Sequence, residues 1–204
     1  MSGKKYELVD LESGKKTTLD ARSGSVGPDC LNIGNVTKDF GAFTFDPGFM
    51  ATASCESKIT YIDGDAGILL YRGYPIEQLA AKSSFIEVAY LLIYGELPTP
   101  KQLEQFDHSI RFHTMINETL LRFFNGFHYD AHPMAMVSAV VSSMAAFYHD
   151  SMDNHNPRHR EIFAHRILAK IPTISAAAYK HMLGQPFVYP RNDMDYCANM
   201  LRMF

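Results

Sequence analysis

The chain has 204 residues, 47% of them hydrophobic and 20% charged, a balance typical of a globular protein and not of a disordered or collagen-like one. The net charge of −3 leaves no basic surplus for a phosphate backbone, so nucleic acid is not expected as a partner. The cysteines, Cys30, Cys55 and Cys197, form no C-x-x-C pair, and the N-terminus has no apolar secretory core, so a cytoplasmic location is expected.

Residues 1–50 are expected to form a β-rich N-terminal arm. Residues 6–11 and 15–19 alternate like short strands, joined by a two-residue Ser-Gly turn at 13–14. Glycine and proline then interrupt the chain repeatedly, and one more short strand is expected at residues 43–45. So small a ribbon buries little apolar surface, and we expect it to pack against the main body or against a neighbouring subunit.

Residues 51–204 are expected to form the first part of a larger helical domain. The domain opens with a β hairpin, residues 58–63 and 68–71, around a glycine-containing turn. From Pro75 onward the apolar residues recur at helical spacing.

Capping residues predict where two of these helices begin. Ser84 and Glu87 have the spacing of a capping box, as do Thr99 and Gln102. After the second box the apolar residues continue at helical spacing as far as Phe124, which predicts one long helix.

Further helices are expected in the second half of the chain. The first covers residues 133–148, and its apolar run is shorter than the roughly 20 residues of a membrane span, so no membrane partner is expected. Pro172 is expected to separate a helix over 157–170 from another over 173–183. A final helix over 192–204 has no capping residue at its end, and we expect the domain to be incomplete at the C-terminus.

The histidines raise the hypothesis of a zinc hydrolase around His149 and His159. His155 and His159 have the i, i+4 spacing of helical metal ligands. However, His155 precedes the expected helix, no H-E-x-x-H motif is present, and Arg158 and Arg160 would repel a dication. A structural role is therefore favoured for these histidines, and no metal site is predicted.

A basic face is expected on the helix that begins at Pro157. His159, Phe163, Arg166 and Lys170 share one side of it by the i, i+3 and i+4 rule. Their donors suit a phosphate or an adenine dinucleotide, and the alternative is an ordinary solvated face.

Small residues at helical spacing predict a close approach between helices, either an interior crossing or a subunit interface. They are Ala135, Ala139, Ser142, Ser143, Ala146 and residues 176–178. The methionines of the same apolar run are expected to fill gaps in the core. These are Met134, Met136 and Met144.

Several runs, in order along nearly the whole chain, resemble citrate synthase. They are residues 43–49, 52–65, 71–76, 146–151, 156–161, 170–173 and 184–193. The β-rich arm is similar to that of the bacterial hexameric, NADH-regulated type. The resemblance implies a mainly α fold, the N-terminal half of the family's multi-helical large domain, with a small β-rich arm.

The resemblance implies a parent enzyme of the tricarboxylic acid cycle that converts acetyl-CoA, oxaloacetate and water to citrate and CoA. In the family an aspartate and a histidine move the protons, while a second histidine and arginines hold oxaloacetate. The runs that carry these groups, His-Ala-Asp-His-Glu, Gly-Pro-x-His-Gly and Gly-Phe-Gly-His-Arg, do not occur in these 204 residues. We therefore assign no catalytic residue, expect the chain alone to be inactive, and expect a homo-oligomer, dimer or hexamer, for the full-length protein.

The family's allosteric NADH site resembles residues of this half. By this resemblance the NADH-binding residues are His113, Thr114, Tyr148, Arg166 and Lys170. The family's arginine immediately before the histidine is Phe112 here, and the nearest arginine, Arg111, lies about 100° away round a helix. The alternative function is a stand-alone nucleotide-binding or oligomerisation module derived from the enzyme.

Overall fold

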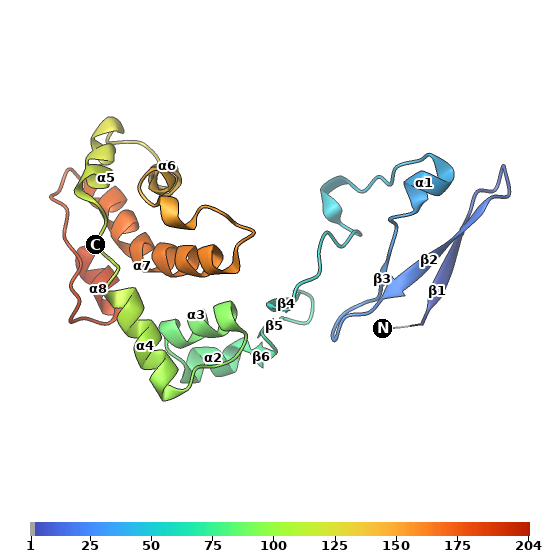
Figure 1. The fold of residues 1–204 in the computed structure, drawn as a ribbon, viewed down its shortest axis with the longest axis horizontal. Coiled ribbons are helices and arrows are strands. Elements are labelled where there is room, and N and C mark those ends of the chain that lie inside the picture. The colour runs from blue at the N-terminus through green and yellow to red at the C-terminus, as the bar shows by residue number, and fades with distance from the viewer. Residues whose placement is uncertain (1–2) are drawn as a thin grey trace. The chain divides into compact units, whose positions relative to one another are not determined.

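The computed structural model describes residues 3–204 and separates them into two compact units, with the boundary between Leu70 and Tyr71 (Figure 1). The first unit contains short strands, and the second contains most of the helices. This mainly α structure with a small strand-rich N-terminal part confirms the fold class that the sequence predicts.

The first unit begins with a small antiparallel sheet in the order β1-β2-β3. Its strands are β1 (Lys5–Val9), β2 (Lys16–Arg22) and β3 (Cys30–Leu31). Along β2, exposed residues alternate with buried ones, which are Thr17, Leu19 and Ala21. This period of two gives the sheet one covered face and one solvated face.

The predicted two-residue turn between the first strands is wrong. The last pair in register is Val9 opposite Lys16, so the connection spans residues 10–15. Backbone N–H groups at both ends of this loop are paired, Gly14 with the Asp10 carbonyl and Asp10 with the Lys15 carbonyl, each at 2.8 Å. Gly14 has a φ of +71°, a conformation that favours glycine because it has no Cβ.

The strand predicted at residues 43–45 does not form. The chain instead makes a short helix, α1 (Val36–Phe40), and a 3₁₀ turn, η1 (Pro47–Phe49). Phe43 and Phe45 are 88% and 91% exposed, and no strand within residues 3–204 pairs with this segment. The second predicted hairpin is confirmed as β4 (Thr60–Asp63) and β5 (Ile68–Tyr71).

The second unit starts with β6 (Tyr74–Pro75) and is otherwise helical (Figure 1). Its α-helices are α2 (Ile76–Lys82), α3 (Phe85–Tyr94), α4 (Pro100–Arg111), α5 (Glu118–Arg122), α6 (Pro133–Ser143), α7 (Pro157–Met182) and α8 (Tyr196–Met203). Both predicted capping boxes form, Ser84 with Glu87 ahead of α3 and Thr99 with Gln102 ahead of α4.

The long helix predicted from Pro100 to Phe124 is divided in two. α4 ends at Arg111, and α5 starts after Asn117, whose side chain accepts the N–H of Thr119 at 2.8 Å. Backbone N–H groups in the first turn of a helix have no partner within the helix, and the Asn117 cap supplies one. The cap therefore stabilises a new helix start here, although the apolar residues continue at helical spacing across the break.

Two other helix boundaries differ from the prediction. The helix expected over 133–148 ends at Ser143, and a 3₁₀ turn, η3 (Met144–Ala146), follows it. The last helix begins at Tyr196 and not near residue 192, because Asp195 acts as its N-cap and accepts the N–H of Ala198 at 2.9 Å.

Pro172 does not separate two helices, so that prediction is wrong. α7 continues through Pro172 without a break and is 26 residues long in all. Proline has no N–H, which leaves the carbonyl four residues earlier, on Leu168, without its helical partner. The hydroxyl of Tyr196 on α8 donates to that carbonyl at 2.9 Å and replaces the missing bond.

Two apolar clusters meet along α7. The first joins the segment from α5 to α7, and its fully buried members include Leu120, Phe124, Met136, Val140, Met144 and Ile174. The second joins α3, α4, α7 and α8 through Ile86, Phe106, Ile110, Ala169 and Tyr196. α7 is therefore the element around which this unit packs, with α6 against one side of it (Figure 1).

The small residues differ in burial. Residues 176–178 of α7 are buried, as a close interior crossing requires, whereas Ala135 of α6 and Ala146 of η3 are exposed. Met136 and Met144 fill the core as expected, but Met134 is 62% exposed, so its prediction as a core residue is wrong.

Candidate functional site

The first feature of the candidate site is a guanidinium held between an aromatic ring and a carboxylate. Arg166 lies on α7, and the 3₁₀ turn η4 (His149–Ser151) supplies its partners. Its two terminal nitrogens donate to the Asp150 carboxylate at 3.0 and 3.1 Å, and Nη1 also donates to the Ser151 hydroxyl at 2.6 Å. The guanidinium carbon lies 4.3 Å from the centre of the Tyr148 ring, a cation–π contact.

The electrostatics of this arrangement follow from its geometry. The hydrogen bonds from Arg166 hold the pKa of Asp150 below its ordinary value. Burial raises the pKa of the Tyr148 hydroxyl although the Arg166 charge opposes the change. The Arg166 side chain is only 16% exposed while the Asp150 side chain is 63% exposed, so the carboxylate is the solvent-facing member of this pair.

Lys170 lies one helical turn beyond Arg166 and is 5% exposed. Its ammonium donates to the backbone carbonyls of His113 and Met115 and lies 5.5 Å from the Tyr148 ring. Burial, and secondarily the charge of Arg166, lowers the pKa of Lys170 to about 8. The predicted basic face is therefore not an ordinary solvated one, because one of its cations is buried and paired.

The segment after α4 supplies the remaining predicted residues. Thr114 is 4% exposed, and its hydroxyl donates to the Arg111 carbonyl at 3.2 Å. The ring Nδ1 of His113 contacts the Ser109 carbonyl at 2.6 Å, and because a carbonyl only accepts, Nδ1 carries the proton. All five residues predicted to bind NADH thus lie in one neighbourhood, although Thr114 and Lys170 present little surface to a ligand.

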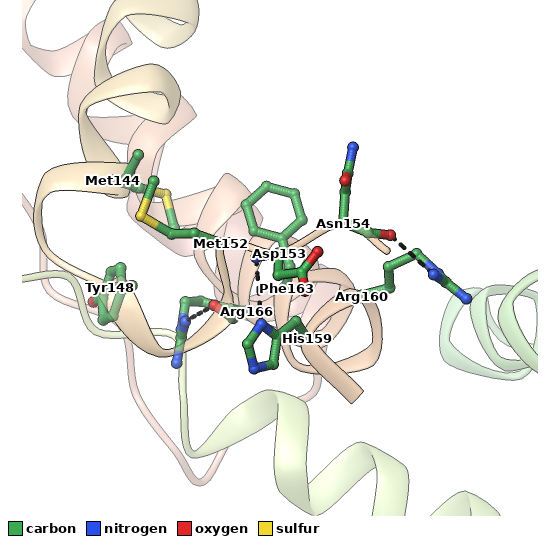
Figure 2. A pocket seen from close by; sticks show the side chains of 11 residues that line it. Met144, Tyr148, Met152, Asp153, Asn154, His159, Arg160, Phe163 and Arg166 are labelled. Atoms are coloured by element: carbon green, nitrogen blue, oxygen red, sulfur yellow. Dashed lines mark hydrogen bonds between the residues drawn. The ribbon is translucent and has the colours of Figure 1, made fainter. Parts of the chain in front are cut away.

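A hollow of about 270 Å³ lies on one side of Arg166 (Figure 2). Its apolar wall contains Met144, Met152 and Phe163. Its polar rim contains Tyr148, Ser151, Asp153, Asn154, His159, Arg160 and Arg166. The predicted face residues His159, Phe163 and Arg166 therefore line one shared hollow.

Two polar groups of this rim are already paired, as the dashed lines in Figure 2 indicate. The ring Nδ1 of His159 accepts the N–H of Asp153 at 3.3 Å. Nη1 of Arg160 donates to the carbonyl of Asn154 at 2.9 Å. The hollow therefore offers an apolar wall with few uncommitted donors, a surface suited to a flat ring and not to a bare anion.

A second hollow, of about 380 Å³, also includes Arg166 in its lining. It is lined by Ser109, His113, Arg158, Glu161, Ile162, His165 and Arg166. The Tyr94 hydroxyl donates to the Glu161 carboxylate at 2.9 Å and contacts Nε2 of His165 at 2.7 Å. The hydrogen bond to Glu161 and burial together raise the pKa of Tyr94, with burial the larger cause.

The sequence analysis missed this second group of residues. Glu161 and His165 are four residues apart, so they share a face of α7, which was the signal available in the sequence. Tyr94 comes from α3, far away along the chain, and only the tertiary structure brings it to the pair.

The histidines of the zinc hypothesis do not converge. His155 precedes α7, as expected, while His149 lies in η4. Within residues 3–204, no group of three or more histidine, cysteine, aspartate or glutamate side chains is arranged to hold a metal ion. None of the helices that the structure describes is both long and apolar enough to cross a bilayer.

Comparison with known proteins identifies relatives of the chain. The family described as "Citrate synthase, C-terminal domain" matches residues 48–204. Citrate synthase from Pyrobaculum aerophilum is 32% identical with a TM-score of 0.69, over 76% of this chain and 41% of that one. The enzyme from Thermotoga maritima is 29% identical with a TM-score of 0.65, over 78% and 41%.

A third solved structure shares the fold. It is the ternary complex of citrate synthase from Thermoplasma acidophilum with carboxymethyl coenzyme A and oxaloacetate, 24% identical with a TM-score of 0.72. The alignment covers 78% of this chain and 42% of that one. The chain thus spans about two fifths of the length of these structures.

Proposed function

Because the chain belongs to the citrate synthase family, we propose that it forms part of an enzyme that condenses acetyl-CoA with oxaloacetate and water to give citrate and CoA. The observation that carries the proposal is the family match over residues 48–204, which includes all of the helical unit. The solved relatives at 32% and 29% identity support it over the same part of the chain.

The proposed role of this chain is structural and regulatory. Forming an enol from a thioester needs a carboxylate base and a histidine donor in one cleft. The family's runs that carry such groups are missing from the 204 residues, so we assign no catalytic residue and no catalytic cofactor to them. We propose that these 204 residues alone do not turn over acetyl-CoA and oxaloacetate.

A turnover assay tests this proposal. The purified chain, with its length verified by intact mass, is mixed with acetyl-CoA and oxaloacetate, and free CoA is detected with a thiol reagent. The expected result is no CoA release above that of the buffer. Sustained release by a preparation that contains nothing longer would contradict it.

The regulatory part of the proposal concerns NADH. We propose that the parent enzyme is a cytoplasmic homo-oligomer of the hexameric type and that NADH binds beside Tyr148 and Arg166. The support is the pair of hollows that both include Arg166 in their linings, one with an apolar wall for a ring and one with basic groups for phosphates. Arg111 is committed to Asp107 by an ion pair and is not counted among the ligand donors.

A titration with NADH tests the regulatory proposal. We expect NADH to bind the unaltered chain, and Arg166→Ala to weaken binding by about tenfold or more because a charge-assisted contact is lost. Arg122→Ala, on the exposed end of α5, is the matched control and is expected to bind normally. Equal NADH affinities for the unaltered chain, Arg166→Ala and Arg122→Ala would show that NADH does not bind at Arg166.

A stand-alone nucleotide-binding module is the second candidate. It is favoured by the fact that all five predicted NADH residues lie within the described chain, whereas no catalytic residue is assigned there. Failure of the unaltered chain to bind NADH would reject this candidate while leaving the family relationship intact.

A further inference from the structure

The second hollow contains a hydrogen-bonded chain whose direction is fixed by proton counting. The Tyr94 hydroxyl has a single proton, and it is donated to the Glu161 carboxylate. The contact of 2.7 Å between Tyr94 and His165 must then use a proton on Nε2 of His165. In the neutral ring Nδ1 is therefore the unprotonated nitrogen.

Aromatic packing holds the His165 ring in place. It meets Phe106 edge to face at 5.0 Å between ring centres, and Tyr94 likewise at 6.2 Å. Phe106 is 4% exposed and belongs to the second apolar cluster, so α3, α4 and α7 all position this ring. The histidine is therefore a fixed group of the fold and not a freely rotating surface side chain.

The charged groups around His165 come from three segments. Tyr94 lies on α3, His113 follows α4, and Arg158 and Glu161 lie on α7 itself. Burial lowers the pKa of His165, Glu161 acts in the opposite direction, and His113 and Arg158 lower the pKa further. The neutral form of the His165 ring is therefore favoured in the empty hollow, and a negative charge that enters the hollow favours the protonated form.

Protonation of His165 creates a donor that needs an acceptor. Nε2 is already used by Tyr94, and Nδ1 has no hydrogen-bond partner among the described residues. Both arginines of the lining are already paired, Arg158 with Glu161 at 3.6 Å and Arg166 with Asp150, so a proton on His165 leaves the hollow with an uncompensated positive charge. An anion supplies both the acceptor and the opposite charge.

We propose that the hollow lined by His113, Arg158 and His165 binds a phosphate-class anion together with a proton on His165. The anion is either a free oxyanion or the diphosphate of a nucleotide, and only the nucleotide case rests on the proposed function. Through this coupling, ligand affinity rises as pH falls, and Tyr94 and Glu161 hold the ring that carries the proton.

The experiment measures affinity for two probes at about pH 6 and about pH 8. Sulfate keeps a constant charge over this range, and so does the diphosphate of NADH. For the unaltered chain we expect the affinity for at least one probe to fall about tenfold between the two pH values. In His165→Phe, which keeps an aromatic ring, the fall is expected to shrink to within about threefold. His128→Gln, an exposed histidine outside both hollows, is the control and should retain the full fall.

A second measurement needs no variant. The imidazole of His165 is titrated by NMR in the unaltered chain, with and without saturating sulfate. Linkage is reciprocal, so a bound anion is expected to raise the His165 pKa by about one unit. This observation would support the proposal even if NADH failed to bind, in which case only the proposed nucleotide regulation would be lost.

The remaining outcomes overturn the proposal. NADH binding with the same pH dependence in His165→Phe as in the unaltered chain would leave the proposed function standing and remove the proton linkage. A His165 titration unaffected by saturating sulfate, together with no binding of either probe, would remove the site itself.

Discussion

The two halves of α7 are built on different principles. Toward its C-terminus the helix buries Ile174, Ala177 and Ala178 in the apolar cluster that it shares with α6. Toward its N-terminus Arg166 and Lys170 lie beneath a polar segment, and each is paired with a specific carboxylate or carbonyl. The apolar half stabilises the fold by filling volume, whereas the polar half depends on every charged group keeping its partner.

The comparison predicts the largest stability loss in the apolar cluster that packs on the C-terminal half of α7. Phe124→Ala deletes a fully buried ring from the first cluster and is expected to lower the free energy of unfolding by about 4 kcal/mol. The neighbouring Phe123→Ala, at a position 45% exposed, should cost clearly less. Denaturant unfolding measures both, and equal losses would contradict the assigned core.

The next effect tests how α7 passes through Pro172. Tyr196→Phe removes the hydroxyl that pairs with the Leu168 carbonyl, and we expect a loss of about 1–2 kcal/mol. Pro172→Ala restores a backbone N–H to that carbonyl, so Tyr196→Phe should cost less in its presence. If a double-mutant cycle gives no coupling between the two changes, the hydroxyl does not compensate for the proline.

A third effect, spread over a pH range, belongs to the polar half of α7. The pKa of Lys170 falls from 10.5 to about 8 on folding, so between these values the unfolded chain holds more protons than the folded one. The free energy of unfolding contributed by Lys170 therefore rises with pH across this window, by at most about 1.4 kcal/mol per pH unit. Lys170→Met should lack this rise when unfolding is measured between about pH 7 and about pH 9.5. Parallel curves for the two proteins would show that the lysine is not buried as described.

Capping and hairpin signals predicted local structure in the helical part of the chain, although the turn at residues 13–14 and the strand at 43–45 were predicted wrongly. The capping boxes at Ser84 and Thr99 and the hairpin around residues 60–71 form as expected, because each depends on residues a few positions apart. The break expected at Pro172 failed because its compensation comes from Tyr196, which no local pattern reveals.

The candidate site was predictable only in part. Helical spacing and family resemblance brought out Arg166 and Lys170, but spacing could not show that Lys170 is buried under the segment after α4. Asp150 and Tyr94 were missed because they approach α7 from other elements. Ion pairs between residues far apart in the chain do not recur at helical or strand spacing, so periodicity in the sequence cannot reveal them.

The most direct test of this division measures stability and NADH affinity on the same two variants. Val140→Ala, in the apolar cluster that α6 shares with the C-terminal half of α7, is expected to lose about 2 kcal/mol of unfolding free energy and to keep the NADH affinity of the unaltered chain under conditions where it stays folded. Arg166→Ala is expected to lose affinity by about tenfold or more. If Val140→Ala instead weakened NADH binding as strongly as Arg166→Ala did, the assignment of binding to the polar half of α7 would be wrong.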